Sequence, residues 1–184
     1  MGLKILSRSE TAKAWGTLAR YTIEQRGQQH TRDVYELGDA AIVLLYDAAK
    51  RTVLLIRQPR LAVQIRGLSP YIIEACAGMV DGDEPEVAAV REAEEETGHR
   101  ISSAEHVFSV FPSPGGVSQQ LHCFMAPYSD ATRVSDGGGL EAEGEEIEVL
   151  EFGFDDAFAR IGREIIDAHT IILLQHLKLS GRMG

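Results

Sequence analysis

Apolar residues along this chain recur in short runs between polar turns, a pattern typical of β-strands. Two strong runs, at 41–46 and 52–57, predict strands joined by the turn 47–51. Further strands are predicted at residues 15–23, 33–36, 71–76, 105–111, 120–127 and 147–152. Helices are predicted at 84–97, 155–161 and 164–179, the last with Ile165, Ile166, Ile172, Leu173 and Leu177 as its buried stripe. Strands interleaved with a few helices predict an α/β (α+β) fold in which helices cover a sheet.

The first part of the chain differs from the rest. Residues 1–37 hold two short strand-like runs around a polar turn at 24–29, which predicts a small antiparallel β unit. We expect residues 1–37 to form this N-terminal unit and residues 38–184 to form the main domain. A chain of 184 residues is long enough for one such domain with a substantial core.

The predicted helix at 84–97 is unusually acidic. Glu92, Glu95 and Glu96 project from one side of a helix that turns roughly 100° per residue. Like charges at this spacing repel, and a divalent cation would reverse the penalty. The flanks predict defined ends. Gly78 is expected to open a turn before the helix, and Gly98 to end it.

The helix start carries its own signals. Asp83 with Glu86 is typical of an N-capping pair, and Pro85 suits the first turn. Arg91 lies four residues before Glu95, so we expect an ion pair that orients the helix.

Composition narrows the classes of partner. A net charge of −10 argues against nucleic acid, because binding to a phosphate backbone needs a basic surface. We expect no membrane span, because no apolar run is long enough, and no secretory signal at residues 1–4. Cys76 and Cys123 lie in apolar surroundings and are interpreted as reduced core residues, with a single disulfide as the alternative. The expected compartment is the cytoplasm.

The segment from Gly78 to Gly98 resembles the Nudix box, the signature of Mg²⁺-dependent hydrolases that split nucleoside diphosphates linked to another group. The match includes Gly78, Glu84, the run from Arg91 to Glu96 and the closing Gly98. Two details depart from the usual pattern. The interval from Glu84 to Arg91 is shorter by a residue, and His99 replaces an aliphatic residue.

The resemblance extends along the chain to one Nudix branch, the ADP-ribose pyrophosphatases and, more similar still, the GDP-mannose pyrophosphatases. It rests on Arg57-Gln58-Pro59-Arg60, Glu74-Ala75-Cys76-Ala77-Gly78, Ser113-Pro114-Gly115-Gly116-Val117, Gly137-Gly138-Gly139 and Glu145-Glu146-Ile147-Glu148-Val149-Leu150-Glu151. It implies a Nudix α/β/α sandwich, a homodimer and Mg²⁺ as cofactor, with Mn²⁺ as a possible substitute.

The implied reaction is hydrolysis of the pyrophosphate bond of a nucleoside diphosphate sugar, with GDP-mannose giving GMP and mannose 1-phosphate. The alternative substrate is ADP-ribose, which would give AMP and ribose 5-phosphate. An alternative of another class is a non-catalytic Nudix-fold sensor of nucleotide sugars. The intact set of Glu92, Glu95, Glu96 and a loop glutamate favours the enzyme.

The spacing of Glu92 and Glu96 makes them the first candidates for metal ligands, and Glu95 is a second-tier or shared ligand. The resemblance adds the backbone carbonyl of Ala77 as a ligand, and Glu145 as both ligand and catalytic base. The catalytic set is therefore Glu95, Glu96 and Glu145. Because the loop that carries Glu145 is longer than in the relatives, Glu143 is the alternative base, whereas Glu141 and Glu146 fit a solvated acidic loop.

The resemblance also implies substrate contacts. Arg60 would clamp a phosphate with its planar fork, whereas Arg57 fits a surface charge equally well. Arg32 and Asp33 would reach the site of the partner subunit. Trp15 matches an aromatic residue near the base, although a core or interface role is equally consistent.

Two further substrate-contacting positions depart from the GDP-mannose pattern. Gln119 stands where glutamate is expected, and His169 where lysine is expected. A histidine in place of a lysine loses a fixed positive charge at neutral pH. Metal chemistry should survive these changes, and substrate selectivity is where they should act.

Overall fold

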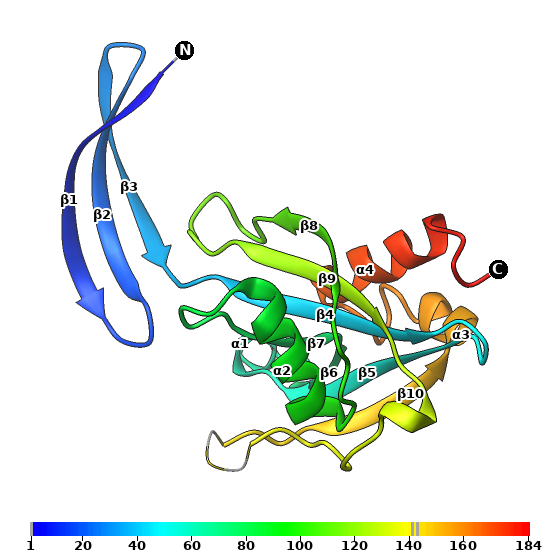
Figure 1. Ribbon diagram of the computed structural model, residues 1–184. Coiled ribbons are helices and arrows are strands. Elements are labelled where there is room, and N and C mark those ends of the chain that lie inside the picture. The colour runs from blue at the N-terminus through cyan, green and yellow to red at the C-terminus, as the bar shows by residue number, and fades with distance from the viewer. Residues whose placement is uncertain (1, 141, 143) are drawn as a thin grey trace.

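The computed structural model describes residues 2–140, 142 and 144–184. A three-stranded antiparallel sheet projects from the rest of the molecule (Figure 1). Its strands are β1 (Leu3–Lys13), β2 (Thr17–Gln25) and β3 (Gln28–Glu36). The sequence predicted the second and third strands, although β3 is longer than expected. Strand β1 was missed because its side chains are exposed along its whole length, so burial imposes no alternation on the sequence.

The main body is built on a seven-stranded sheet with the order β10-β5-β4-β9-β8, in which β6 also pairs with β5 and β7 with β4. The strands are β4 (Ala40–Asp47), β5 (Thr52–Pro59), β6 (Tyr71–Glu74), β7 (Cys76–Met79), β8 (Glu105–Val110), β9 (Leu121–Pro127) and β10 (Glu148–Gly153). Strands β4 and β9 run parallel, and the other pairs are antiparallel. The predicted strand at 71–76 is divided at Ala75, where the chain passes from the β5 edge to the β4 edge.

Helices cover both faces of this sheet, as the α/β prediction requires. They are α1 (Leu61–Gln64), α2 (Pro85–Thr97), α3 (Phe154–Ala159) and α4 (Ala168–Leu179), with a 3-10 turn η1 (Asp130–Thr132). Strand β4 is apolar at nearly every position because both of its faces are buried. Ile42 and Leu44 pack toward α3 and α4, and Val43 and Leu45 toward α2.

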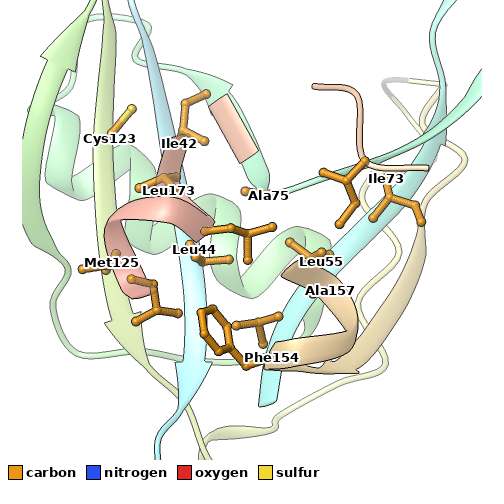
Figure 2. Packing of buried hydrophobic residues seen from close by; sticks show 14 of the residues in the cluster. Ile42, Leu44, Leu55, Ile73, Ala75, Cys123, Met125, Phe154, Ala157 and Leu173 are labelled. Carbon is orange, nitrogen blue, oxygen red and sulfur yellow. The ribbon is translucent and has the colours of Figure 1, made fainter. Parts of the chain in front are cut away.

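The core on the α3 and α4 side is shown in Figure 2. The labelled side chains that fill it come from strands and helices distant in sequence: Ile42, Leu44, Leu55, Ile73, Ala75, Cys123, Met125, Phe154, Ala157 and Leu173. Cys76 and Cys123 are both buried and free, which confirms the reduced-core interpretation. Within the described residues, no helix is both long and apolar enough to cross a membrane.

The C-terminal helix was predicted to begin too early. It begins after Asp167, whose Oδ2 accepts hydrogen bonds from the backbone N and the Oγ1 of Thr170 at 2.8 and 2.7 Å. Ile165 is buried but precedes the helix. Ile166 and Ile172 are exposed and were wrongly assigned to the buried stripe. The error follows from extending a helical period through residues that form a turn.

Candidate functional site

Helix α2 carries the candidate metal ligands. It begins at Pro85 and ends at Thr97, and the C-cap residue Gly98 has a left-handed φ of 74°, as expected for the predicted stop. The predicted Asp83–Glu86 cap does not form. Glu84 is the N-cap residue and has no capping side-chain bond, and Glu86 Oε1 instead accepts a hydrogen bond from Ala104 N at 3.2 Å. The fixed φ of Pro85 therefore starts the helix without a capping box.

The buried face of α2 holds two carboxylates. Glu92 is 7% exposed and Glu96 1% exposed, and the Glu96 Oε2 accepts a hydrogen bond from Ala77 N at 3.0 Å. Arg91 pairs with Glu95 at 3.2 Å, which confirms the predicted ion pair. Its guanidinium also lies 2.7 Å from Glu92 Oε1 and donates to the carbonyl of Met79 at 3.1 Å. Arg91 therefore ties the helix to strand β7.

Gly78 lies within strand β7, so the prediction that it opens a turn is wrong. Its φ is not in the left-handed region, and its backbone pairs with Ala41 of β4. What excludes a side chain is space: a Cβ at Gly78 would lie 1.9 Å from Glu92 Oε1. The Glu92 carboxylate therefore packs directly against the backbone of Gly78.

Burial raises the pKa of both helix carboxyls. The pKa of Glu92 rises to about 7 because burial outweighs the opposing charge of Arg91. The pKa of Glu96 rises to about 8, again through burial, although the hydrogen bond from Ala77 opposes the rise. The negative charge of Glu145 raises both values further. Carboxylates that repel one another in a buried place match the donor set of a hard divalent cation.

Glu145 reaches this cluster from the loop before β10. Its Oε2 accepts a hydrogen bond from Leu140 N at 2.8 Å, and its side chain lines the same cavity as Glu92. The alternative base, Glu143, and its neighbour Glu141 lie outside the described residues. Glu146 faces elsewhere, because it accepts a hydrogen bond from Tyr71 at 3.3 Å beside a different cavity.

A cavity of about 500 Å³ gathers most of the predicted site residues. Those that line it are Trp15, Arg60, Ala77, Glu92, Gln119, Glu145 and His169. Glu95 and Glu96 are not among the lining residues. Glu96 accepts a hydrogen bond from Ala77 of β7, and Glu95 pairs with Arg91 on the helix. Arg57 lines the separate cavity beside Tyr71 and pairs with Glu148, which agrees with a surface role.

Acidic residues that the sequence did not reveal as site residues also line the cavity, namely Glu74, Asp81 and Asp167. Glu74 accepts a hydrogen bond from Arg60 Nε at 2.8 Å, and Asp167 Oδ1 lies 3.0 Å from His169 Nδ1. Burial raises the pKa of Glu74, and Arg60 opposes the rise. A carboxylate that ends the apolar strand β6 was a usable signal for Glu74, because an acidic residue is rarely buried without a partner.

The remaining polar groups of the cavity differ in how they are held. Gln119 Nε2 donates to the Gly38 carbonyl at 2.9 Å, which fixes the orientation of its amide. His169 Nε2 is buried and has no hydrogen-bond partner among the described residues. Trp15 is exposed at the cavity mouth, so it is not a core residue.

Arg32 and Asp33 do not line the cavity of their own chain. Both lie on β3, where Asp33 accepts two hydrogen bonds from Arg20 at 2.7 and 2.9 Å and Arg32 Nη1 donates to the Thr31 carbonyl. Their contribution to a partner subunit stays a prediction.

The donor set fits Mg²⁺ in chemistry. Among the described residues, no three acidic, histidine or cysteine side chains are already arranged to hold a metal ion. Mg²⁺ usually takes one or two carboxylates together with waters and substrate phosphates, so a complete protein cage is not required. Glu92 and Glu96 with the Ala77 carbonyl provide hard oxygen donors, and Glu145 lies across the cavity.

Comparisons with known proteins point to one family and support the fold. A family model described as the NUDIX domain matches residues 36–172. A GDP-mannose pyrophosphatase of Cronobacter sakazakii is 50% identical over 157 residues, which are 84% of this chain and 81% of that protein. A GDP-mannose pyrophosphatase of Salmonella arizonae is 46% identical over 159 residues, 85% of this chain and 82% of that protein. A solved structure titled "Crystal structure of ADP compounds hydrolase" has a TM-score of 0.75 over 99% of this chain and 97% of that chain, at 18% identity, and supports the fold.

Proposed function

Because this chain belongs to the Nudix family, we propose that it hydrolyses the pyrophosphate bond of a nucleoside diphosphate sugar, with GDP-mannose as its first substrate. The products would be GMP and mannose 1-phosphate. The observation that carries the proposal is the cavity that places Glu92 and Glu145 together with Arg60. The GDP-mannose pyrophosphatases at 46 to 50% identity over most of the chain support the choice of substrate.

A bound diphosphate needs N–H donors for its oxygens and a metal ion to neutralise its charge, and the cavity holds residues suited to both. Arg60 and His169 line the cavity and carry N–H groups that would donate to phosphate oxygens. Glu92, Glu96, Glu145 and the Ala77 carbonyl would hold the metal. When bound, Mg²⁺ neutralises phosphate charge and makes a bound water easier to deprotonate. The whole-chain charge of −10 does not oppose an anionic substrate, because the local field comes from these groups.

The protein's own residues would accept the proton, bind the phosphate and hold the helix in position. Glu145 would accept a proton from the attacking water through Oε1, since Leu140 N already bonds to its Oε2. Arg60 holds its guanidinium in place through the bond from Nε to Glu74, which leaves its two amino groups for a phosphate. Ala77 N fixes Glu96 by donating a hydrogen bond to its Oε2, so the metal would be held through the other oxygen, Oε1. Glu95 holds Arg91 and thereby the helix orientation.

The finer features of the proposal follow from the same resemblance. We expect Mg²⁺ as the metal, with Mn²⁺ as a substitute, and a cytoplasmic homodimer whose N-terminal sheet brings Arg32 and Asp33 to the partner's site. A fully active monomer in sedimentation at assay concentration would contradict the dimer.

The test of function is hydrolysis of GDP-mannose, ADP-ribose, ADP-glucose and UDP-glucose with Mg²⁺, with the products identified by mass. We expect the highest kcat/KM for GDP-mannose. A preference for ADP-ribose would overturn the substrate and leave the reaction intact. Binding without cleavage of any of the four would instead support the sensor.

A further inference from the structure

Three consecutive glycines form the start of the loop that carries Glu145. Gly137, Gly138 and Gly139 have φ values of 68, 109 and 76°. Residues with side chains rarely adopt these conformations, whereas glycine does so without a steric penalty. Three such residues in a row therefore allow a path of the backbone that residues with side chains would resist.

That path follows the end of helix α2. Gly138 N donates to the carbonyl of Glu96 at 2.9 Å, and Gly139 N donates to the carbonyl of Glu95 at 3.1 Å. Because α2 ends at Thr97, these two carbonyls would otherwise lack helical donors. The glycine run thus binds the backbone of two residues whose side chains belong to the acidic cluster.

No side chain fits between the glycine run and the helix. A Cβ at Gly137 would lie 2.5 Å from the Glu96 carbonyl oxygen, and a Cβ at Gly98 would lie 2.3 Å from the carbonyl oxygen of Ser135. The two backbones are therefore in direct contact.

The other side of the run touches Glu145. A Cβ at Gly139 would lie 2.3 Å from Glu145 Oε2, the oxygen that accepts the hydrogen bond from Leu140 N at 2.8 Å. One short segment therefore contacts the helix backbone at one end and the loop carboxylate at the other.

We propose that the Gly137–Gly139 run is a positioning element that holds the Glu145 carboxylate in register with Glu92 and Glu96. The inference rests on the proposed function, in which these carboxylates act together. A loop without this attachment would have to order Glu145 in each catalytic cycle, whereas an attached loop presents it already in place.

The test variant is Gly138→Ala. A Cβ at Gly138 meets nothing closer than the Ile147 carbonyl at 3.8 Å, so the substitution disturbs the backbone conformation without a clash. The matched control is Gly162→Ala, which also places alanine at a positive φ, 75°, in open space and away from the cavity lining. Both variants should lose similar thermal stability.

With GDP-mannose as substrate, Gly138→Ala should lower kcat roughly 10- to 100-fold with little change in KM, the scale expected for a misplaced catalytic group. Gly162→Ala should keep the wild-type kcat. In a double-mutant cycle, Gly138→Ala should cost nothing further in a Glu145→Gln background, because both changes act through one carboxylate. Independent, multiplicative losses would overturn the proposal, and so would an unchanged kcat in Gly138→Ala.

A second readout does not depend on activity. Mg²⁺ should raise the Tm of the wild type and of Gly162→Ala by the same amount, and that of Gly138→Ala by less. A full shift in Gly138→Ala, or no shift in the wild type, would overturn the proposal. If the wild type cleaves no nucleotide sugar, the proposed function fails while this comparison still decides the positioning role. If Gly138→Ala does not fold, Gly139→Ala, whose methyl group would displace Glu145, takes its place in both measurements.

Discussion

The replacement Gly78→Ala tests whether the position of the Glu92 carboxylate controls activity. The new Cβ would lie 1.9 Å from Glu92 Oε1, whereas ordinary contact begins at 3.4 Å. The carboxylate must therefore withdraw by 3.4 − 1.9 = 1.5 Å. A misplacement of about 1 Å at a reacting centre can cost on the order of 100-fold in rate, or roughly 2.7 kcal/mol. We expect kcat/KM to fall by at least this factor.

The fold should tolerate the same change. The clashing atoms belong to the end of a flexible side chain, and the backbone of Gly78 is in a conformation that alanine adopts readily. Replacing glycine by alanine in such a conformation also restricts the unfolded chain, which contributes about 0.4–1 kcal/mol of stability. We therefore expect an unchanged fold by circular dichroism and a Tm close to that of the wild type.

The assay is steady-state hydrolysis of GDP-mannose at saturating Mg²⁺, together with thermal unfolding of the same samples. Gly153→Ala is the matched control, because a Cβ there meets nothing within 4 Å and its φ is −56°. That variant should keep full activity. Wild-type kcat/KM in Gly78→Ala would refute the argument that Gly78 fixes the Glu92 carboxylate.

Three other predictions concern the same structure. Glu96→Gln should fold but lose turnover roughly 100-fold or more, the scale of losing an electrostatic partner of the transition state, and normal kcat at saturating Mg²⁺ would contradict the metal assignment. In EDTA, Tm should fall as pH rises from about 4.5 to 8, because the pKa values of Glu92 and Glu96 are about 7 and about 8 in the folded protein but near 4.5 in the unfolded chain. Mg²⁺ should reduce this dependence of Tm on pH. A Tm that rises over the same pH range would contradict the conclusion that burial raises the two pKa values. Cys76 and Cys123 should react with a thiol reagent only after unfolding, since burial raises the pKa of both and that of Cys123 to about 12; rapid labelling of the native protein would show that they are accessible.

The parts of the fold predicted well are those where burial imposes a period on the sequence. Strand β4 is buried on both faces and β5 nearly so, and both were found within a residue or two of their ends. Strand β1 has no buried side chain, so its residues carry no such pattern. The start of α4 was misplaced because Ile165 and Ile166 continue an apolar run into a turn that Asp167 ends by capping the helix.

In the candidate site, too, local features were predicted from the sequence and non-local contacts were not. The spacing of Glu92 and Glu96 on one helix face is local, and the sequence alone predicted it. The contacts that hold these side chains are not local: Glu96 accepts a hydrogen bond from Ala77 of strand β7, and Glu92 lies against Gly78 of the same strand. Glu74 was passed over because its partner, Arg60, is fourteen residues away and meets it only across the pairing of β5 with β6.

In the proposed function, chemistry and selectivity would depend on different elements of the cavity. Glu92 and Glu96 lie on α2 against β7, and Ala88, Ala89 and Ala93 anchor the helix in the core as Cys76 anchors the strand. Gln119 comes from the segment before β9 and donates a hydrogen bond to the Gly38 carbonyl. His169 comes from α4 and pairs with Asp167. Changes at these two positions can therefore alter which base or sugar fits without moving the cluster. A polar group that finds no partner on the wrong substrate would reject it strongly, and the buried, unpaired Nε2 of His169 is such a group. Substrate preference in this chain should consequently be more readily changed than the reaction itself.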